Sequence, residues 1–98
     1  MQQDVQMPVN ISELVWMNLL QGDSSAFAEI YNMYADGMFA YGSCFIDDAE
    51  LVKDAIHDIF LRLYNNRTSV LTDNLKFYLL RAVKNEMYGI LRNKKEFC

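Results

Sequence analysis

The last quarter of the chain, Asn74–Lys95, places the strongest constraint on the fold because it has the pattern of one long amphipathic helix. Its apolar residues recur mostly at steps of three and four positions, which is the spacing of one helix face. They are Leu75, Tyr78, Leu79, Ala82, Val83, Ile90 and Leu91. The pattern predicts a helix with one side in a hydrophobic core and a polar outer side.

Two earlier segments show the same periodicity. A helix is expected from Asp23 or Ser24, either of which can act as the cap, to about Gly42. Another is expected over about Ala49–Asn65, capped by Asp47 or Asp48. The first stripe is Phe27, Ile30, Tyr31, Tyr34, Met38 and Tyr41, and the second is Leu51, Val52, Ala55, Ile56, Ile59, Phe60 and Leu63. Both stripes are interpreted as core faces, and Gly37 within the first indicates a close helix contact.

A short helix is expected before these two, over about Ser12–Leu20. Asn10 and Glu13 have the spacing of a capping box, and Gly22 is the expected stop. The side chains expected to face inward are Leu14, Val15, Met17 and Leu20, with Trp16 to one side.

Composition limits the chain to one domain of the all-α class. It has 98 residues, with one proline and four glycines, which leaves little material for strands and tight turns. We therefore predict a compact bundle of three longer helices plus a short N-terminal helix. Residues 1–10 are expected to be a flexible lead-in, residues 11–95 the helical domain and residues 96–98 a tail.

The sequence lacks the features of a membrane or secreted protein. No apolar run reaches the roughly 20 residues of a membrane span, and no basic residue precedes an apolar core at the N-terminus. Cys44 and Cys98 lack the spacing of metal ligands, and Cys44 is expected to be a small buried residue of a reduced protein. These features predict a cytoplasmic location.

Charge divides the chain into two unequal parts. Residues 1–73 hold three basic and eleven acidic residues, a net charge of −8, whereas residues 74–98 hold six basic and two acidic residues, a net charge of +4. An acidic body with a basic terminal helix indicates two partners of opposite charge. The alternative is that the surface charge is merely uneven.

The basic helix has the composition of a nucleic-acid contact. Cations would bind phosphates, and the neighbouring rings of Phe77, Tyr78 and Tyr88 suit stacking on unpaired bases. The alternative for the rings is that Tyr78 belongs to the core and Phe77 is an isolated surface ring.

Catalytic chemistry has little support in the sequence. Asp54, His57 and Asp58 have spacing compatible with metal ligands, but a solvated acidic helix face explains them better, because zinc favours cysteine or a second histidine. No glycine-rich phosphate loop is present. We predict no catalytic residues, no metal and no cofactor.

Four motifs in order resemble region 2 of bacterial RNA polymerase sigma factors, most closely the extracytoplasmic-function (ECF) group of the sigma-70 family. They are GDSSAFAEIYNMY at Gly22–Tyr34, DDAELVKDAIHDIFLRLY at Asp47–Tyr64, NLKFYLLRAVKN at Asn74–Asn85 and LRNKK at Leu91–Lys95. The resemblance implies a helical domain that acts in transcription initiation, by binding core RNA polymerase and by recognising and melting the −10 promoter element.

The resemblance also implies where each partner binds. The helix containing DAIHDIF would dock on the clamp helices of the largest polymerase subunit, through Asp54, His57, Asp58, Phe60 and Arg62. The loop Arg67–Asp73, with Arg67, Thr68 and Ser69 as contacts, would capture a flipped base of the melted strand. The last helix would meet promoter DNA through Lys76, Arg81, Lys84, Asn85, Arg92, Lys94 and Lys95, with Asn85 suited to a base edge and the cations to phosphates. An anti-sigma factor is a further kind of partner that the resemblance allows.

The chain departs from the family pattern in two places. Many members have an acid four residues after the position of Asn85, where this chain has Gly89. Complete members continue into a helix-turn-helix domain that reads the −35 element, and no such segment follows Lys95, so an excised or truncated protein is expected. The competing hypothesis is a helical protein-interaction module without a nucleic-acid role.

Overall fold

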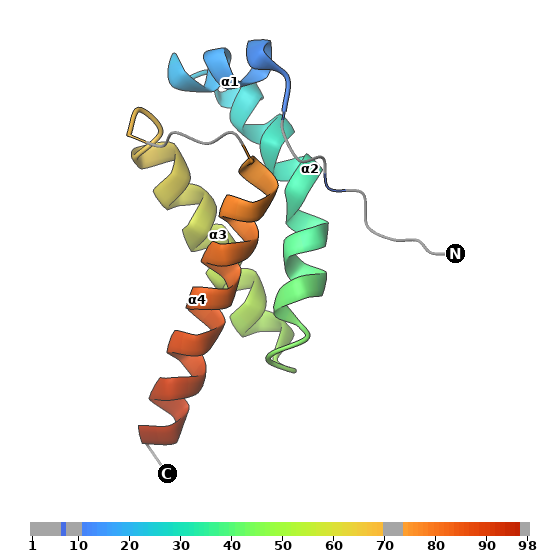
Figure 1. The fold of residues 1–98 in the computed structure, drawn as a ribbon, viewed down its shortest axis with the longest axis vertical. Coiled ribbons are helices and arrows are strands. Elements are labelled where there is room, and N and C mark those ends of the chain that lie inside the picture. Colours follow the sequence, from blue (N-terminus) through green and yellow to red (C-terminus); the bar gives the residue numbers. More distant parts are fainter. Residues whose placement is uncertain (1–6, 8–10, 70–73, 97–98) are drawn as a thin grey trace, which may run out of the picture.

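The computed structural model describes Met7, residues 11–69 and residues 74–96. These residues form α1 (Glu13–Leu20), α2 (Ser24–Gly42), α3 (Ala49–Asn65) and α4 (Leu75–Glu96), without a strand among them. Figure 1 shows α2, α3 and α4 side by side and α1 across one end. The prediction of an all-α bundle with three longer helices and a short N-terminal one is confirmed.

Local side-chain chemistry explains where the first three helices begin. The Ser12 hydroxyl accepts a hydrogen bond from the Val15 amide, and the carboxylates of Asp23 and Asp48 accept from Ser25 and Glu50 amides. Each bond satisfies an amide that the first turn of a helix leaves without a partner. Asp23 and Asp48 were among the expected caps, whereas Asn10 lies outside the described residues.

Gly22 ends α1, as predicted. Its φ of +87° is in the left-handed region that glycine tolerates best, and the Asp23 amide there donates to the Asn18 carbonyl over 3.0 Å. The chain thereby reverses into α2 within a few residues.

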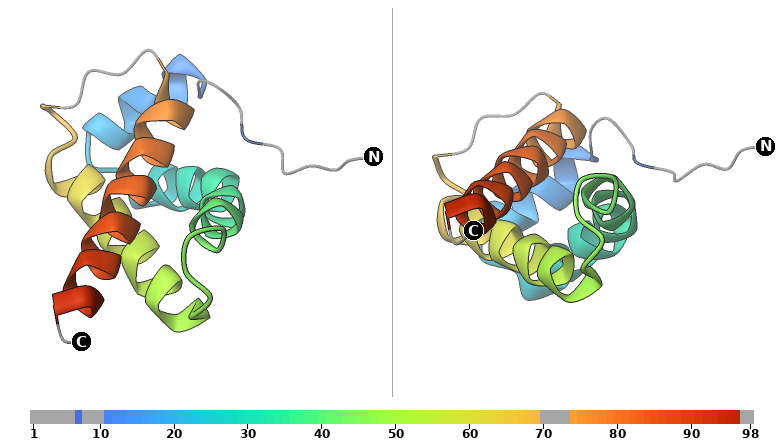
Figure 2. Two further views of the ribbon diagram at one scale, coloured as in Figure 1. Left: turned by 60° about the horizontal axis from the view of Figure 1, so that its bottom comes forward. Right: turned by 90° about the horizontal axis from the view of Figure 1, so that it is seen from below.

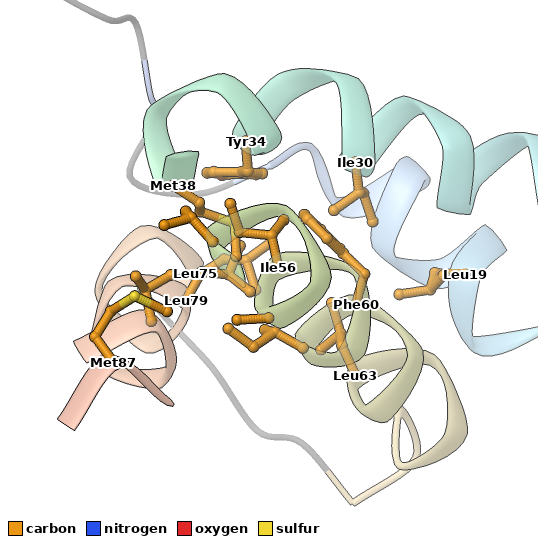
Figure 3. Close-up of a cluster of buried hydrophobic side chains, with 14 of the residues drawn as sticks. Leu19, Ile30, Tyr34, Met38, Ile56, Phe60, Leu63, Leu75, Leu79 and Met87 are labelled. Atoms are coloured by element: carbon orange, nitrogen blue, oxygen red, sulfur yellow. The ribbon is translucent and has the colours of Figure 1, made fainter. Parts of the chain in front are cut away.

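Three helices share one core, with α1 covering the end near the start of α2 (Figures 1 and 2). Figure 3 shows Tyr34 and Met38 of α2, Ile56 and Phe60 of α3, and Leu79 of α4 meeting at its centre. Of the predicted stripe of α3, only Leu51 falls short of full burial. The strict periodicity of this helix therefore identified its core face correctly.

The core face of α4 is narrower than predicted. Leu75, Leu79, Val83 and Met87 are fully buried at successive steps of four, which is the ridge that commonly packs into a neighbouring helix. Met87 was not among the predicted residues. Two residues expected on this stripe, Tyr78 and Leu91, are instead exposed.

The predicted inward face of α1 was wrong at Leu14 and Met17, whereas Val15 packs against the core as predicted. Leu14 and Met17 are 68% and 56% exposed, whereas Leu19 is fully buried and Trp16 packs half-buried against the core. Apolar residues surround this short helix on all sides, so spacing alone does not define an inward face.

Two smaller expectations concern the burial of Cys44 and the N-terminal lead-in. Cys44 is exposed rather than buried, because it lies in the turn after α2. Met7 is the single described residue of the expected lead-in, and it packs half-buried against the core.

No helix within the described residues has the length and apolar character to cross a membrane.

Gly42 lies where α2 comes close to both α3 and α4. A Cβ atom at this position would lie 2.9 Å from Val52 Cγ1 and 3.3 Å from Val83 Cγ1. Since Val52 belongs to α3 and Val83 to α4, the absence of a side chain on Gly42 lets the end of α2 contact both. Gly37, the glycine for which such a contact was expected, is buried within α2.

Tyr34 should make the stability of the fold sensitive to alkaline pH. Its side chain is fully buried, and this burial raises the pKa of its hydroxyl from 10.0 to about 12. The unfolded chain therefore releases this proton first, so the stability contributed below pH 10.0 is lost as the pH rises to about 12. Urea unfolding across this range should show a decline that is smaller in Tyr34→Phe, and an equal decline in both proteins would contradict the assignment.

Candidate protein-binding groove and nucleic-acid interface

The outer side of α4 carries a regular row of rings and cations. Phe77, Arg81, Lys84, Tyr88 and Arg92 are all exposed and follow one another at steps of three or four, opposite the buried ridge. We call these five residues the basic–aromatic stripe. Asn85 is exposed one turn beyond Arg81, so it also borders the stripe.

The three rings of α4 considered for base stacking all reach solvent. Phe77 is 55% exposed, Tyr78 38% and Tyr88 47%. Of the two alternatives left open by the sequence, placement of Tyr78 in the core is therefore wrong. Cations accompany the rings, with Lys76 Nζ 5.5 Å from the Phe77 ring centroid and Lys84 Nζ 5.8 Å from that of Tyr88.

The remaining predicted DNA contacts lie on α4 and in the turn after α3. Lys76 is half-buried near the start of α4, while Thr68 and Ser69 are exposed in the turn after α3. The other residues of the predicted base-capturing loop, 70–73, lie outside the described residues. Lys94 and Lys95 belong to the last turns of α4.

Arg67 has a structural role that the sequence did not reveal. Its guanidinium lies 4.3 Å from the Tyr64 ring centroid, donates from Nε to the Leu20 carbonyl over 3.3 Å, and donates from Nη1 to the Tyr64 carbonyl over 2.8 Å. The Tyr64 hydroxyl donates to the Gly22 carbonyl over 3.2 Å. We call Gly22, Tyr64 and Arg67 the clasp, because they join the end of α1 to the end of α3.

The clasp changes the expected role of Arg67. Two of its nitrogen atoms already donate to main-chain carbonyls where α1 and α3 end, those of Leu20 and Tyr64. A DNA contact by Arg67 would compete with these bonds. The structure therefore gives Arg67 a role in holding the end of α3 against the end of α1.

A surface groove of about 490 Å³ lies between α2 and α3. Its apolar lining comes from Tyr31, Ala35, Phe39 and Ile56, and its polar lining from Asp36, Glu50, Lys53, Asp54 and His57. Three carboxylates against one lysine make the groove acidic. The predicted contacts Asp54 and His57 are thus brought together, and α2 adds Asp36 and Phe39, which sequence reasoning missed because their position depends on how α2 packs on α3.

The other predicted polymerase contacts lie in three different environments. Asp58 is exposed on α3, one turn beyond Asp54, and so extends the acidic surface of the groove. Phe60 is fully buried, with its ring centroid 4.7 Å from that of Tyr31, so its expected place in the contact surface needs correction. Phe60 supports α2 beneath the groove and cannot itself touch a partner.

Arg62 connects α3 to α4. Its guanidinium donates a hydrogen bond to the carboxylate of Glu86, forming an ion pair between the two helices. Glu86 is one of the two acids of α4. Because Arg62 neutralises it at the side of α4, the basic–aromatic stripe faces outward without an opposing charge from Glu86.

The described residues bring no three of His, Cys, Asp or Glu together in a way that could hold a metal ion. Asp54 and His57 instead contribute to the groove lining. Comparisons of the chain with models of known protein families, with curated protein sequences and with solved protein structures give no match.

Proposed function

We propose that this chain is a transcription initiation factor domain similar to region 2 of the sigma-70 family, which binds core RNA polymerase and recognises and melts the −10 promoter element. The observation that carries the proposal is the placement of two oppositely charged surfaces on one shared core. The acidic groove lies between α2 and α3, and the basic–aromatic stripe lies on the outer side of α4.

The groove supports the polymerase contact. Its apolar lining can take an aliphatic side chain, while Asp36, Glu50 and Asp54 attract cations on either side of that chain. A partner helix with apolar residues between arginines or lysines fits this surface. The proposed partner segment is the clamp-helix region of the largest polymerase subunit.

The basic–aromatic stripe supports the promoter contact. Arg81, Lys84 and Arg92 can neutralise phosphates, and Asn85 beside them can pair with a base edge. Exposed rings between the cations add the stacking surface that unpaired bases need. This combination suits a strand that is being separated from its partner better than an intact duplex alone.

The competing function is a helical protein-interaction module. It is favoured by α1, which exposes Leu14 and Met17 on the surface of the bundle. Such a module would also use the groove, but it would not depend on the cations of α4. Binding to polymerase and binding to DNA therefore distinguish the two functions.

Polymerase binding tests the proposal most directly. We expect the full chain to bind core RNA polymerase and a clamp-helix fragment, and we expect Asp54→Lys with Asp58→Lys to weaken binding about tenfold or more, because cations would then face cations. Fluorescence anisotropy measures both affinities, and circular dichroism confirms the fold.

Glu13→Lys is the control, because it makes a single charge reversal of the same kind on α1, outside the groove. It should leave polymerase affinity close to that of the native chain. If the folded native chain binds neither polymerase nor the fragment, or if the Asp54 and Asp58 reversals have no effect, the polymerase part of the proposal is wrong.

A further inference from the structure

Three aromatic rings connect the end of α2 to the outer side of α4. The Phe45 ring, in the α2–α3 connection, lies edge-on to both of its neighbours, with centroids 5.3 Å from Tyr41 and 5.8 Å from Tyr88. Tyr41 and Phe45 are half-buried and pack against the core, whereas Tyr88 is 47% exposed. A surface ring is thus held by a row of rings that is anchored in the core.

Cations flank the exposed ring on its own helix. Lys84 and Arg92 lie one turn before and one turn after Tyr88, and all three residues are exposed on the same side of α4. Lys84 Nζ is 5.8 Å from the Tyr88 ring centroid. A ring between two cations matches the repeating unit of a nucleic-acid strand, in which each base lies between two phosphates.

Two of the nearby acids, Asp48 and Glu86, already have partners within the fold. The Asp48 carboxylate accepts hydrogen bonds from the Glu50 and Leu51 amides at the start of α3, and Glu86 is paired with Arg62. Asp47 is the remaining exposed acid in the described connection between Phe45 and α3.

We propose that Tyr88 stacks on an unpaired base of single-stranded DNA, with Lys84 and Arg92 at the phosphates on either side and Phe45 as the residue that positions the ring. The inference rests on the proposed function, for which it names the residue that contacts the melted strand at the C-terminal half of α4. In a duplex the faces of the bases are covered by their neighbours, so stacking on Tyr88 requires a separated strand.

The site lies well away from the turn that precedes α4. Tyr88 follows Phe77 by eleven positions, which corresponds to about 16 Å along the helix axis. Figure 1 shows the α2–α3 connection at the end of the bundle opposite the α3–α4 turn. A single strand that followed the basic–aromatic stripe would therefore meet separate rings near its two ends.

The contact between Phe45 and Tyr88 holds the Tyr88 ring in place before a strand binds. A free tyrosine on a helix surface loses rotamer freedom when a base stacks on it, and that loss weakens binding. The edge-on contact with Phe45 already restricts the Tyr88 ring. Phe45 thus acts through Tyr88 and does not need to touch the strand.

The test uses the full chain with a fluorescein-labelled oligothymidine of about twelve nucleotides and a duplex of the same length. Tyr88→Ala should weaken binding of the single strand about fivefold or more, the loss of one stacked base, while changing duplex affinity by less than about twofold. Tyr88→Phe keeps the ring and should bind as the native chain does. Anisotropy measures both affinities at low salt.

The positioning role of Phe45 is tested by a separate measurement of base stacking. An oligonucleotide containing 2-aminopurine loses fluorescence when that base stacks, so quenching reports on stacking rather than on folding. Phe45→Ala should reduce the quenching and Phe45→Tyr should restore it, while thermal melting followed by circular dichroism identifies any variant that does not fold. If folded Phe45→Ala quenches as the native chain does, the positioning role of Phe45 is wrong.

Two results would contradict the stacking role of Tyr88 and still be compatible with the proposed function. One is unchanged single-strand affinity in Tyr88→Ala, and the other is equal weakening of single strand and duplex. In either case, weaker DNA binding after loss of the α4 cations would still support the proposed DNA contact. If the folded native chain binds neither oligonucleotide, both the stacking role and the DNA part of the proposed function fail.

Discussion

Replacing Phe60 with alanine is expected to lower the free energy of unfolding by about 3–5 kcal/mol. The ring is fully buried, and it contacts the rings of Tyr31 and Phe27, whose centroids lie 4.7 Å and 6.2 Å away. Removing it leaves a cavity between α2 and α3. Domains of this kind are stable by only about 5–15 kcal/mol, so a large part of the stability would be lost. Urea unfolding followed by circular dichroism measures the change.

Phe60→Leu separates this structural role from a role in binding. Leucine refills much of the space, so the loss of stability should be smaller than in Phe60→Ala. Because the Phe60 ring does not reach the surface, polymerase affinity of the folded Phe60→Leu chain should match that of the native chain. A stable Phe60→Leu chain that had lost polymerase binding would show that the ring takes part in the contact after all.

Replacing Arg81, Lys84 and Arg92 together with glutamine is expected to abolish most DNA binding. Each cation that neutralises a phosphate contributes about 0.9 to the slope of log affinity against log salt for duplex DNA. Loss of all three should lower that slope by about 2.7 and weaken binding by much more than tenfold at low salt. Titrations at several salt concentrations measure both quantities.

Lys53→Gln provides the matched control for this series. Lys53 is exposed and carries the same charge, but it lines the groove between α2 and α3. Its replacement should leave the salt slope unchanged, whereas each single replacement on α4 should lower it. Equal effects of Lys53→Gln and Arg81→Gln would indicate a general attraction to the whole chain and would contradict a localised interface.

Sequence periodicity predicted the fold where one side of a helix differs clearly from the other. In α3, charged residues alternate with Val52, Ile56 and Ile59, so the buried face could be predicted nearly completely. In α1 the apolar residues are too evenly spread, and two of the predicted inward positions, Leu14 and Met17, are exposed. In α4 the predicted apolar stripe was wider than the buried ridge, which ends at Met87. Tyr78 and Leu91 have the spacing expected at the edge of a buried face, but both are exposed.

The candidate surfaces were predictable only as far as single helices define them. Spacing along the last helix predicted a polar outer side, and Arg81, Lys84 and Arg92 lie on it. The groove also needs Asp36 and Phe39 of α2, and their distance from Asp54 follows from the packing angle of two helices, which one-dimensional spacing does not contain. The motif that contains Phe60 likewise cannot separate a ring that touches a partner from one that supports the surface beneath it.

The clasp has a consequence for how the sequence can change over evolutionary time. A Cβ atom on Gly22 would lie 3.3 Å from Arg67 Nη2 and 3.4 Å from the Tyr64 hydroxyl, and the backbone there has a positive φ. A substitution at Gly22, Tyr64 or Arg67 therefore changes the space available to the other two residues. This holds although Gly22 lies more than forty positions before the other two in the sequence. Among descendants of this chain the three residues should be inherited or lost together, as a correlated set that links the first turn of the bundle to the segment leading into α4.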